Sequence, residues 1–248
     1  MTSPAASAVP PPLCFERGFT LTELAIVMFI VALLIGGMVL PLSAQQDLRQ
    51  RQETEQTLTE VREALYGFAI ANGRLPRPAT SATDGTEQVA NCTNDADCAG
   101  FIPWATLGTK RADAWGKLIR YSVTPAFSSS AAPVAFGTIP NRTVQTRTPA
   151  GALAYLAGDA ACATASACIP AVVFSQGKLR WGTLDDGSAI PDGSSTNADE
   201  DTNNTGPNNH VSRTGTEETI ATGGEFDDIV VWISSHTLIN RLVSSGKL

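Results

Sequence analysis

The stretch that decides the fold spans residues 17–40 and reads RGFTLTELAIVMFIVALLIGGMVL. From Leu24 onward it contains no charged residue, and its apolar character extends through Pro41 to Leu42. Nineteen residues rise about 28 Å as an α-helix, close to the roughly 30 Å hydrocarbon core of a bilayer. The run therefore predicts a membrane-embedded helix over about residues 24–42.

A secretory signal peptide is the alternative interpretation of the same run. The apolar region of such a signal is usually about 7–15 residues long, which is shorter than this run. The cleavage motif that would follow, Leu42-Ser43-Ala44, also lacks a small residue at its first position. Release of a secreted protein after Ala44 is therefore the lesser hypothesis.

The residues in front of the run form a pattern of fixed order, in which a basic residue and a glycine precede an aromatic residue and a glutamate: Arg17, Gly18, Phe19 and Glu23. This pattern resembles the N-terminal signature of type IV prepilins and pseudopilins, and the resemblance covers residues 17–42. It implies that a prepilin peptidase cleaves between Gly18 and Phe19. It also implies loss of a leader at residues 1–18 and methylation of the new amine.

Two roles are open to Glu23. Thr20 and Glu23 have the spacing of a capping box, and a carboxylate in the first turn of a helix is stabilised by the helix dipole. However, a charge beside a membrane-length apolar run is costly and usually has a function. In the resembled family this carboxylate pairs with the terminal amine of a neighbouring subunit, which here would be the amine of Phe19. The resemblance therefore implies an assembly role that is compatible with capping.

We expect the helix to continue past the membrane run, so that it covers about residues 19–72. Its second half carries apolar residues at three- and four-residue steps, which predict one buried face: Leu58, Val61, Leu65 and Phe68. Asn72-Gly73 is the predicted stop. Two glycines and Pro41 predict a kink or a locally melted turn near residues 37–41, because proline removes one backbone hydrogen bond.

The remainder, residues 73–248, predicts a globular head. Short apolar runs separated by loop-forming residues predict five strands: 118–123, 134–139, 153–156, 171–174 and 229–233. A short amphipathic helix is predicted at the end of the chain, with one apolar face: Leu238, Ile239, Leu242 and Val243. This order indicates an α+β fold, in which an antiparallel sheet lies on the long N-terminal helix. Four short head segments are similar to segments of pseudopilin-type and minor-pilin-type proteins: 72–76, 103–108, 113–116 and 224–232.

The spacing of the cysteines indicates whether the protein forms disulfides and therefore in which cellular compartment it folds. Four of the five cysteines form two close pairs, Cys92/Cys98 and Cys162/Cys168, and the fifth, Cys14, lies in the leader. Four cysteines allow three connectivities, of which the repeated spacing favours two local disulfides. Disulfides indicate an oxidising compartment. The resemblance implies a bacterial inner-membrane protein with an extracytoplasmic head, which later enters a periplasmic or cell-surface filament.

The charge is acidic and unevenly distributed. The formal net charge is -7, and eleven of the 24 acidic residues lie in residues 185–228, where Arg213 is the only basic residue. A nucleic-acid binder should present a basic face, so this balance argues against nucleic acid as a partner. One acidic segment of the head therefore dominates its electrostatics.

This acidic segment is the candidate metal site. Asp199 and Asp201 begin a pattern like a calcium loop, but the glycine and the final glutamate of an EF-hand are missing. Major pseudopilins hold calcium in a C-terminal loop, and Asp227-Asp228 is similar to that region. Two alternatives stay open, a solvated acidic loop or a calcium site whose ligands come from four aspartates: Asp199, Asp201, Asp227 and Asp228.

No catalytic constellation emerges from the sequence. His210 and His236 are the only histidines, and no phosphate-binding glycine loop occurs. We therefore expect a structural subunit and not an enzyme. The resemblance implies contact with lipid before assembly and three kinds of protein partner, a prepilin peptidase, other pilin-like subunits and an inner-membrane assembly platform. The filament would be a type IV pilus or a type II secretion pseudopilus. An uncleaved, membrane-anchored extracytoplasmic binding module is the alternative.

Overall fold

The computed structural model describes residues 18–248, apart from the side chains of residues 37–42. Of the expected leader, residues 1–17 lie outside the described residues. The chain divides into two compact units, Met1–Asp47 and Leu48–Leu248, and helix α1 contributes to both. The described elements are, in chain order, α1 (Leu21–Asn72), β1 (Ala99–Phe101), α2 (Trp104–Leu107), β2 (Arg120–Val123), α3 (Pro125–Ser128), β3 (Thr143–Arg147), β4 (Leu153–Ala157), β5 (Ala171–Ser175), β6 (Gly182–Thr183), β7 (Ala189–Ile190), α4 (Ala198–Thr205), β8 (Asn209–Val211), β9 (Ile229–Ile233) and α5 (Ser235–Ser244).

The first unit consists, as far as it is described, of a short extended segment and the first part of α1. The helix is continuous through residues 37–41, so of the two outcomes predicted there, a kink or a locally melted turn, the melted turn does not occur. A proline removes one backbone hydrogen bond, and this loss does not end a helix whose turns on both sides keep theirs.

The second unit begins with the C-terminal part of α1, whose predicted apolar stripe is confirmed for three of its four residues, since Phe68 is only half-buried. Leu58, Val61 and Leu65 are fully buried in the main core. The predicted stop is also confirmed, because α1 ends at Asn72 and Gly73 takes a φ of +71°. Glycine reaches this left-handed conformation without the steric cost of a side chain.

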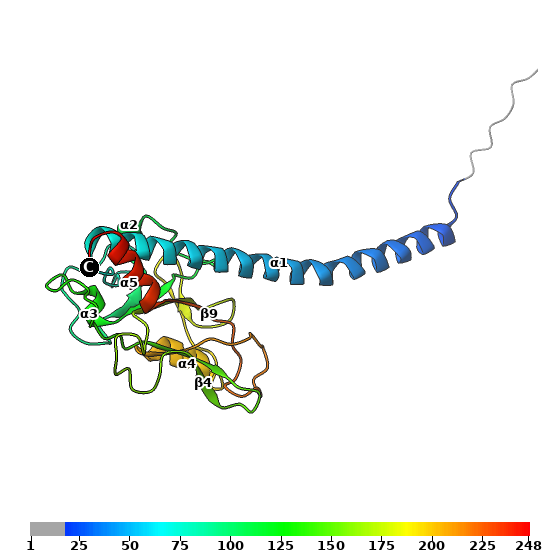
Figure 1. The fold of residues 1–248 in the computed structure, drawn as a ribbon. Helices are drawn as coiled ribbons and strands as arrows, with labels where there is room; N and C mark the ends of the chain where they lie inside the picture. Colours follow the sequence, from blue (N-terminus) through cyan, green and yellow to red (C-terminus); the bar gives the residue numbers. More distant parts are fainter. Residues whose placement is uncertain (1–17) are drawn as a thin grey trace, which may run out of the picture. The chain divides into compact units, whose positions relative to one another are not determined.

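The main sheet has the strand order β1-β2-β5-β9 and is antiparallel throughout. The side chains of β5, one of its two inner strands, alternate between two cores, as expected for a strand covered on both faces. Ala171 and Val173 face the core that contains α1 and α5, whereas Val172 and Phe174 face a second, smaller core. The predicted α+β fold, a long N-terminal helix followed by a head with an antiparallel sheet, is thus confirmed (Figure 1).

A second, three-stranded sheet covers the other face of β5. Its order is β4-β3-β8, in which β3 pairs antiparallel with β4 and parallel with β8. Val144 of β3 packs into the smaller core from this second sheet. Figure 1 places β4 and α4 on the side of the head away from the C-terminal part of α1.

One predicted strand is wrong. Residues 134–139 form no strand, and a turn closed by the Thr138 N–H and the Ala135 carbonyl lies there instead. Pro133 and Pro140 flank the segment, and proline cannot donate to a sheet ladder. The amphipathic helix at the end of the chain is confirmed as α5, with Leu238 and Leu242 buried.

Candidate functional site

The proposed cleavage point lies in a segment that is open to solvent. Gly18 and Phe19 are both exposed and precede the first residue of α1 in non-helical backbone. Phe19 exposes 84% of its surface. No atom of another residue beyond its chain neighbours lies within 4 Å of a side-chain position built on Gly18. A protease could therefore reach the Gly18–Phe19 peptide bond without unfolding any described element.

A complete capping box begins α1. The Glu23 carboxylate accepts hydrogen bonds from the Thr20 backbone N–H (2.9 Å) and from the Thr20 hydroxyl (2.8 Å). In return, the Glu23 backbone N–H donates to the Thr20 hydroxyl at 3.2 Å. The bonds from Thr20 lower the pKa of Glu23 below that of a free glutamate. The carboxylate is therefore ionised, held in place and still exposed to an external cation.

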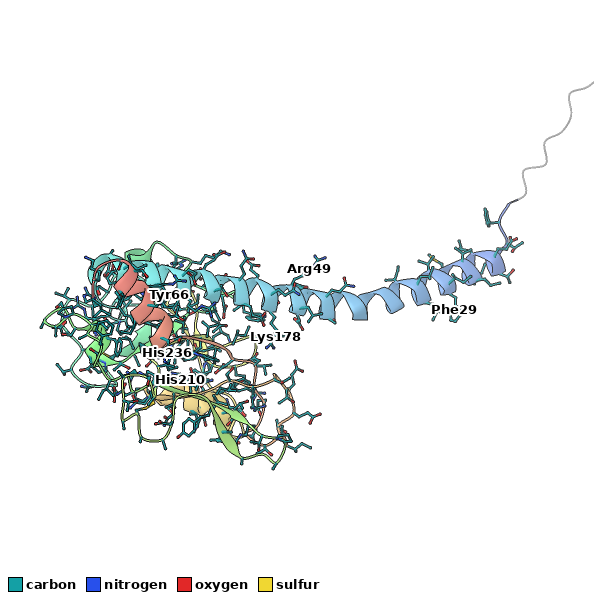
Figure 2. The ribbon with its side chains drawn as sticks, viewed as in Figure 1. Phe29, Arg49, Tyr66, Lys178, His210 and His236 are labelled. Carbon is teal, nitrogen blue, oxygen red and sulfur yellow. A yellow bond between two sulfur atoms is a disulfide. The ribbon has the colours of Figure 1, made fainter. Side chains whose placement is uncertain are left out.

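The helix that follows exposes apolar side chains on all sides. Between Phe19 and Ile35 every large apolar side chain is exposed, from 42% at Val31 to 85% at Leu21, and Phe29 extends freely from α1 in Figure 2. Consecutive residues of a helix point about 100° apart, so such a run covers the whole circumference. Apolar surface of this extent marks a contact site for a partner or a membrane.

The expected span, residues 24–42, includes residues 37–42, whose side chains lie outside the described residues. Across the rest of the described chain, no helix contains a stretch that is both long and apolar enough to span a membrane.

Three carboxylates converge inside the head. Glu200 of α4 meets Asp227 and Asp228, which precede β9, and one oxygen of each lies within 4.8 Å of the others. Asp228 accepts a hydrogen bond of 2.7 Å from the Asn203 amide. Asp227 Oδ2 accepts one of 2.6 Å from the Leu179 N–H, while its buried Oδ1 has no partner among the described residues. The three carboxylates of this cluster are the best-placed ligands for a cation.

Burial gives the carboxylate cluster unusual proton affinity. It raises the pKa of Glu200 to about 7, and the neighbouring charge of Asp227 adds to the effect. Burial also raises the pKa of Asp227, and that of Asp228 well above the ordinary value. The buried Lys117 ammonium does not pair with them directly, since its Nζ donates to three backbone carbonyls: Gln176, Leu179 and Arg180. The cluster therefore favours a proton or a cation.

The structure brings together only part of the predicted calcium site. Asp227 and Asp228 meet, but Asp199 is buried between two arginines, at 2.6 Å from Arg147 and 2.7 Å from Arg213. Asp201 follows on α4, half-buried, and does not join the carboxylate cluster.

Sequence reasoning missed Glu200, although it chose both of its neighbours. Consecutive helical residues point about 100° apart, so one residue of the Asp199–Glu200–Asp201 run at most can face Asp228. The helix phase was the missing information. Short polar segments such as α4 give no apolar stripe from which to read it.

The two histidines differ in burial, since His210 is buried and His236 is exposed. His210 is 1% exposed, lies deep in the head (Figure 2) and packs its ring 5.6 Å from that of Phe174. Burial, helped by Arg142, lowers the pKa of His210 to about 3, so the imidazole stays neutral. His236 lies on α5 and lines an open groove of about 520 Å³ beside Phe136.

Both predicted disulfides are present. Cys92 is bonded to Cys98, and Cys162 to Cys168. Cys98 is fully buried in the main core, whereas the second disulfide closes a loop between β4 and β5. The local connectivity is therefore confirmed, and it supports the expectation of an oxidising compartment.

Comparison with known proteins identifies the N-terminal segment. Residues 15–39 match the prokaryotic N-terminal methylation motif, the signature of type IV prepilin-like proteins. No curated protein and no solved structure matches the chain. The match covers the capping box and the exposed apolar side chains from Phe19 to Ile35.

Proposed function

We propose that this chain, which carries the type IV prepilin-like N-terminal signature, is a structural subunit of a type IV pilus or a type II secretion pseudopilus. A prepilin peptidase cleaves between Gly18 and Phe19, and the Phe19 amine is methylated. Before assembly the apolar part of α1, about residues 24–42, is held in the inner membrane, with the head outside the cytoplasm. An assembly platform then transfers the subunit into the filament, where other pilin-like subunits replace lipid around α1.

The observation that carries the proposal is the combination of Glu23 with the exposed apolar helix. The apolar side chains between Phe19 and Ile35 have no partner among the described residues that would bury them. Packing against like helices removes that surface from water or lipid. Glu23 would then lie in an apolar environment, where a charge needs a counter-charge. The Phe19 amine of a neighbouring subunit supplies one.

The test separates capping from assembly. Glu23→Ala removes the carboxylate, whereas Thr20→Ala removes the hydroxyl that caps the helix but leaves Glu23 and the Phe19 amine in place. Glu60→Ala changes an exposed glutamate of the same helix outside the matched motif. We expect Glu23→Ala to reduce incorporation into sheared filaments at least about tenfold, equivalent to about 1.4 kcal/mol. Thr20→Ala and Glu60→Ala should stay near wild type.

The mass of the mature chain distinguishes the alternatives. Filament assembly predicts a chain that begins at Phe19 and carries one methyl group. An uncleaved membrane-anchored binding module would keep its leader, and a secreted protein would begin at Gln45. Equal incorporation of Glu23→Ala and Glu60→Ala, or a mature chain with another first residue, would refute the proposal.

For the head we propose a calcium site at the carboxylate cluster of Glu200, Asp227 and Asp228. Oxygen ligands at this density suit calcium, and the unpartnered Asp227 Oδ1 favours a cation there. Calorimetric titration of the full-length chain with calcium chloride should give a binding heat that Asp228→Asn abolishes. Glu218→Gln, an exposed carboxylate of the same acidic segment, should leave the heat unchanged. Absence of heat up to millimolar calcium would remove this site.

A further inference from the structure

The two edges of the small sheet β4-β3-β8 differ in whether their outer backbone groups are hydrogen-bonded. At the β8 edge the side-chain amide of Asn203 imitates a neighbouring strand, because it accepts a 2.6 Å hydrogen bond from the Val211 N–H and donates a 3.0 Å bond to the Val211 carbonyl. At the other edge, among residues 18–248, β4 pairs with β3 alone. One edge is therefore closed by α4, and the other presents free backbone donors and acceptors.

The β4 edge also carries none of the charged residues or prolines that block strand addition at many natural edges. Natural edge strands carry lysine, proline or inward-pointing charge, whereas β4 reads LAYLA. A β-bulge at Leu156, opposite Val144 and Gln145, interrupts the edge only after Tyr155. Residues 153–155 thus form a short, straight and uncharged edge.

The bulge gathers the large side chains of β4 on one face. Ala157 packs against the smaller core, and Ala154 is half-buried, while Leu153, Tyr155 and Leu156 are 45%, 43% and 51% exposed. These three side chains point away from the core. The free edge and an exposed apolar face therefore belong to the same strand.

We propose that this edge binds the same edge of a second copy of the chain, as a two-fold antiparallel strand pair centred near Ala154. The pairing satisfies the free backbone groups and places Leu153 of each copy opposite Tyr155 of the other, an aromatic–aliphatic cross-strand pair that stabilises sheets. Self-pairing meets no like-charge contact, although the chain carries a net charge of -7. Arg147 is already paired with Asp199, and Asp159 lies beyond the overlap.

The contact between two β4 edges is weak because it is small. A pair of three-residue strands buries far less than the ~1,200 Å² of a stable interface, so single heads associate only at high concentration. Where the chain is polymerised, the same edge repeats along each filament, and many weak contacts act together. Lateral association of filaments is then the expected consequence, and this consequence alone rests on the proposed function.

The test uses the full-length chain in detergent with Cys14→Ser, which leaves the four disulfide-bonded cysteines as the only others. Tyr155→Cys places the two thiols of the pair diagonally across the strands on the same face, and a short bis-maleimide should give covalent dimers whose yield rises with protein concentration. Phe136→Cys is the matched control, because Phe136 is a 65% exposed aromatic residue that borders the groove beside α5.

A second pair of variants tests the strand itself. Adding Leu153→Lys to Tyr155→Cys should reduce the dimer yield at least about fivefold, while adding Phe136→Lys should not. Tryptophan fluorescence verifies that the head is folded in each variant. Equal cross-linking of Tyr155→Cys and Phe136→Cys, or equal loss from both lysine variants, would overturn the inference. The assay needs neither cleavage nor Glu23, so its outcome is independent of the filament proposal.

Discussion

Replacing Glu200 by glutamine should make the head more stable at alkaline pH, because glutamine is uncharged and the ionised Glu200 carboxylate is costly to bury. Glu200 is 2% exposed and lies in the carboxylate cluster with Asp227 and Asp228. Burial raises its pKa from the ordinary 4.5 to about 7. The folded state therefore holds a proton on Glu200 over a pH range in which the unfolded chain has released it.

The sign of the effect follows from proton linkage. Between about pH 4.5 and 7 Glu200 holds more of its proton in the folded state than in the unfolded state, so its contribution to the free energy of unfolding falls as the pH rises through this window. At about 1.4 kcal/mol for each pKa unit, the wild-type head loses about 3 kcal/mol from Glu200 by pH 8. Asp227 and Asp228, whose pKa values are also raised, act in the same direction.

Glutamine resembles the protonated glutamate and can keep its contacts. Glu200 Oε1 accepts a hydrogen bond from the Asp227 N–H, and Oε2 accepts one from the Asn197 amide. Asn197 Oδ1 is buried and has no hydrogen-bond donor among the described residues. Rotation of the Asn197 amide would let this oxygen accept from the new glutamine. We therefore expect Glu200→Gln to equal wild type near pH 4 and to exceed it by up to about 3 kcal/mol at pH 8.

Urea unfolding followed by tryptophan fluorescence measures this difference in the full-length chain. All four tryptophans lie in the second unit: Trp104, Trp115, Trp181 and Trp232. The emission therefore reports the head alone, and a chelator excludes bound calcium. Glu218→Gln, at an exposed position, should follow wild type at every pH. If the stability advantage of Glu200→Gln over wild type did not grow from pH 5 to pH 8, or if Glu200→Gln were the less stable protein at pH 8, the reasoning would be wrong.

Two further substitutions test the packing of the second unit, each by urea unfolding. Leu65→Ala removes a fully buried side chain from the contact of α1 with the main sheet and should cost about 2–5 kcal/mol, whereas Leu48→Ala, at a 61% exposed position, should cost less than about 0.5 kcal/mol. Gly224→Ala should destabilise by more than about 2 kcal/mol, because its φ is +78° and a Cβ would lie 1.8 Å from the Thr196 carbonyl oxygen. Gly246→Ala, with a φ of +70° and nothing within 4 Å, should cost about 1 kcal/mol from backbone strain alone.

The parts of the structure that sequence predicted depend on local information. The stripe of Leu58, Val61 and Leu65 repeats with the helical period, and Gly73 ends the helix by its own backbone freedom. The disulfides close over six positions of chain. Each of these features can be read within one short window, and each is confirmed.

The parts that sequence missed depend on partners far away along the chain. Strand β3 pairs in parallel with β8, which lies more than sixty residues later, and its buried Val144 stands among polar residues. Asp199 is neutralised by Arg147, fifty-two positions earlier. A sequence window contains neither partner. The acidic segment 185–228 therefore resembled a solvated loop, although it includes α4, β8 and buried carboxylates.

The two units differ in the kind of group that lacks a partner, which is polar and buried in the head and apolar and exposed in the first unit. In the head most large apolar side chains lie in two cores, and the buried polar atoms without a hydrogen-bond partner among the described residues include Asp227 Oδ1 and Asn197 Oδ1. In the first unit the relation is reversed, since Glu23 is held in place while the apolar surface around it is exposed. An exposed apolar helix is stable only when lipid or protein surrounds it. The second unit thus contains its own cores, whereas no described residue buries the apolar side chains of the first unit.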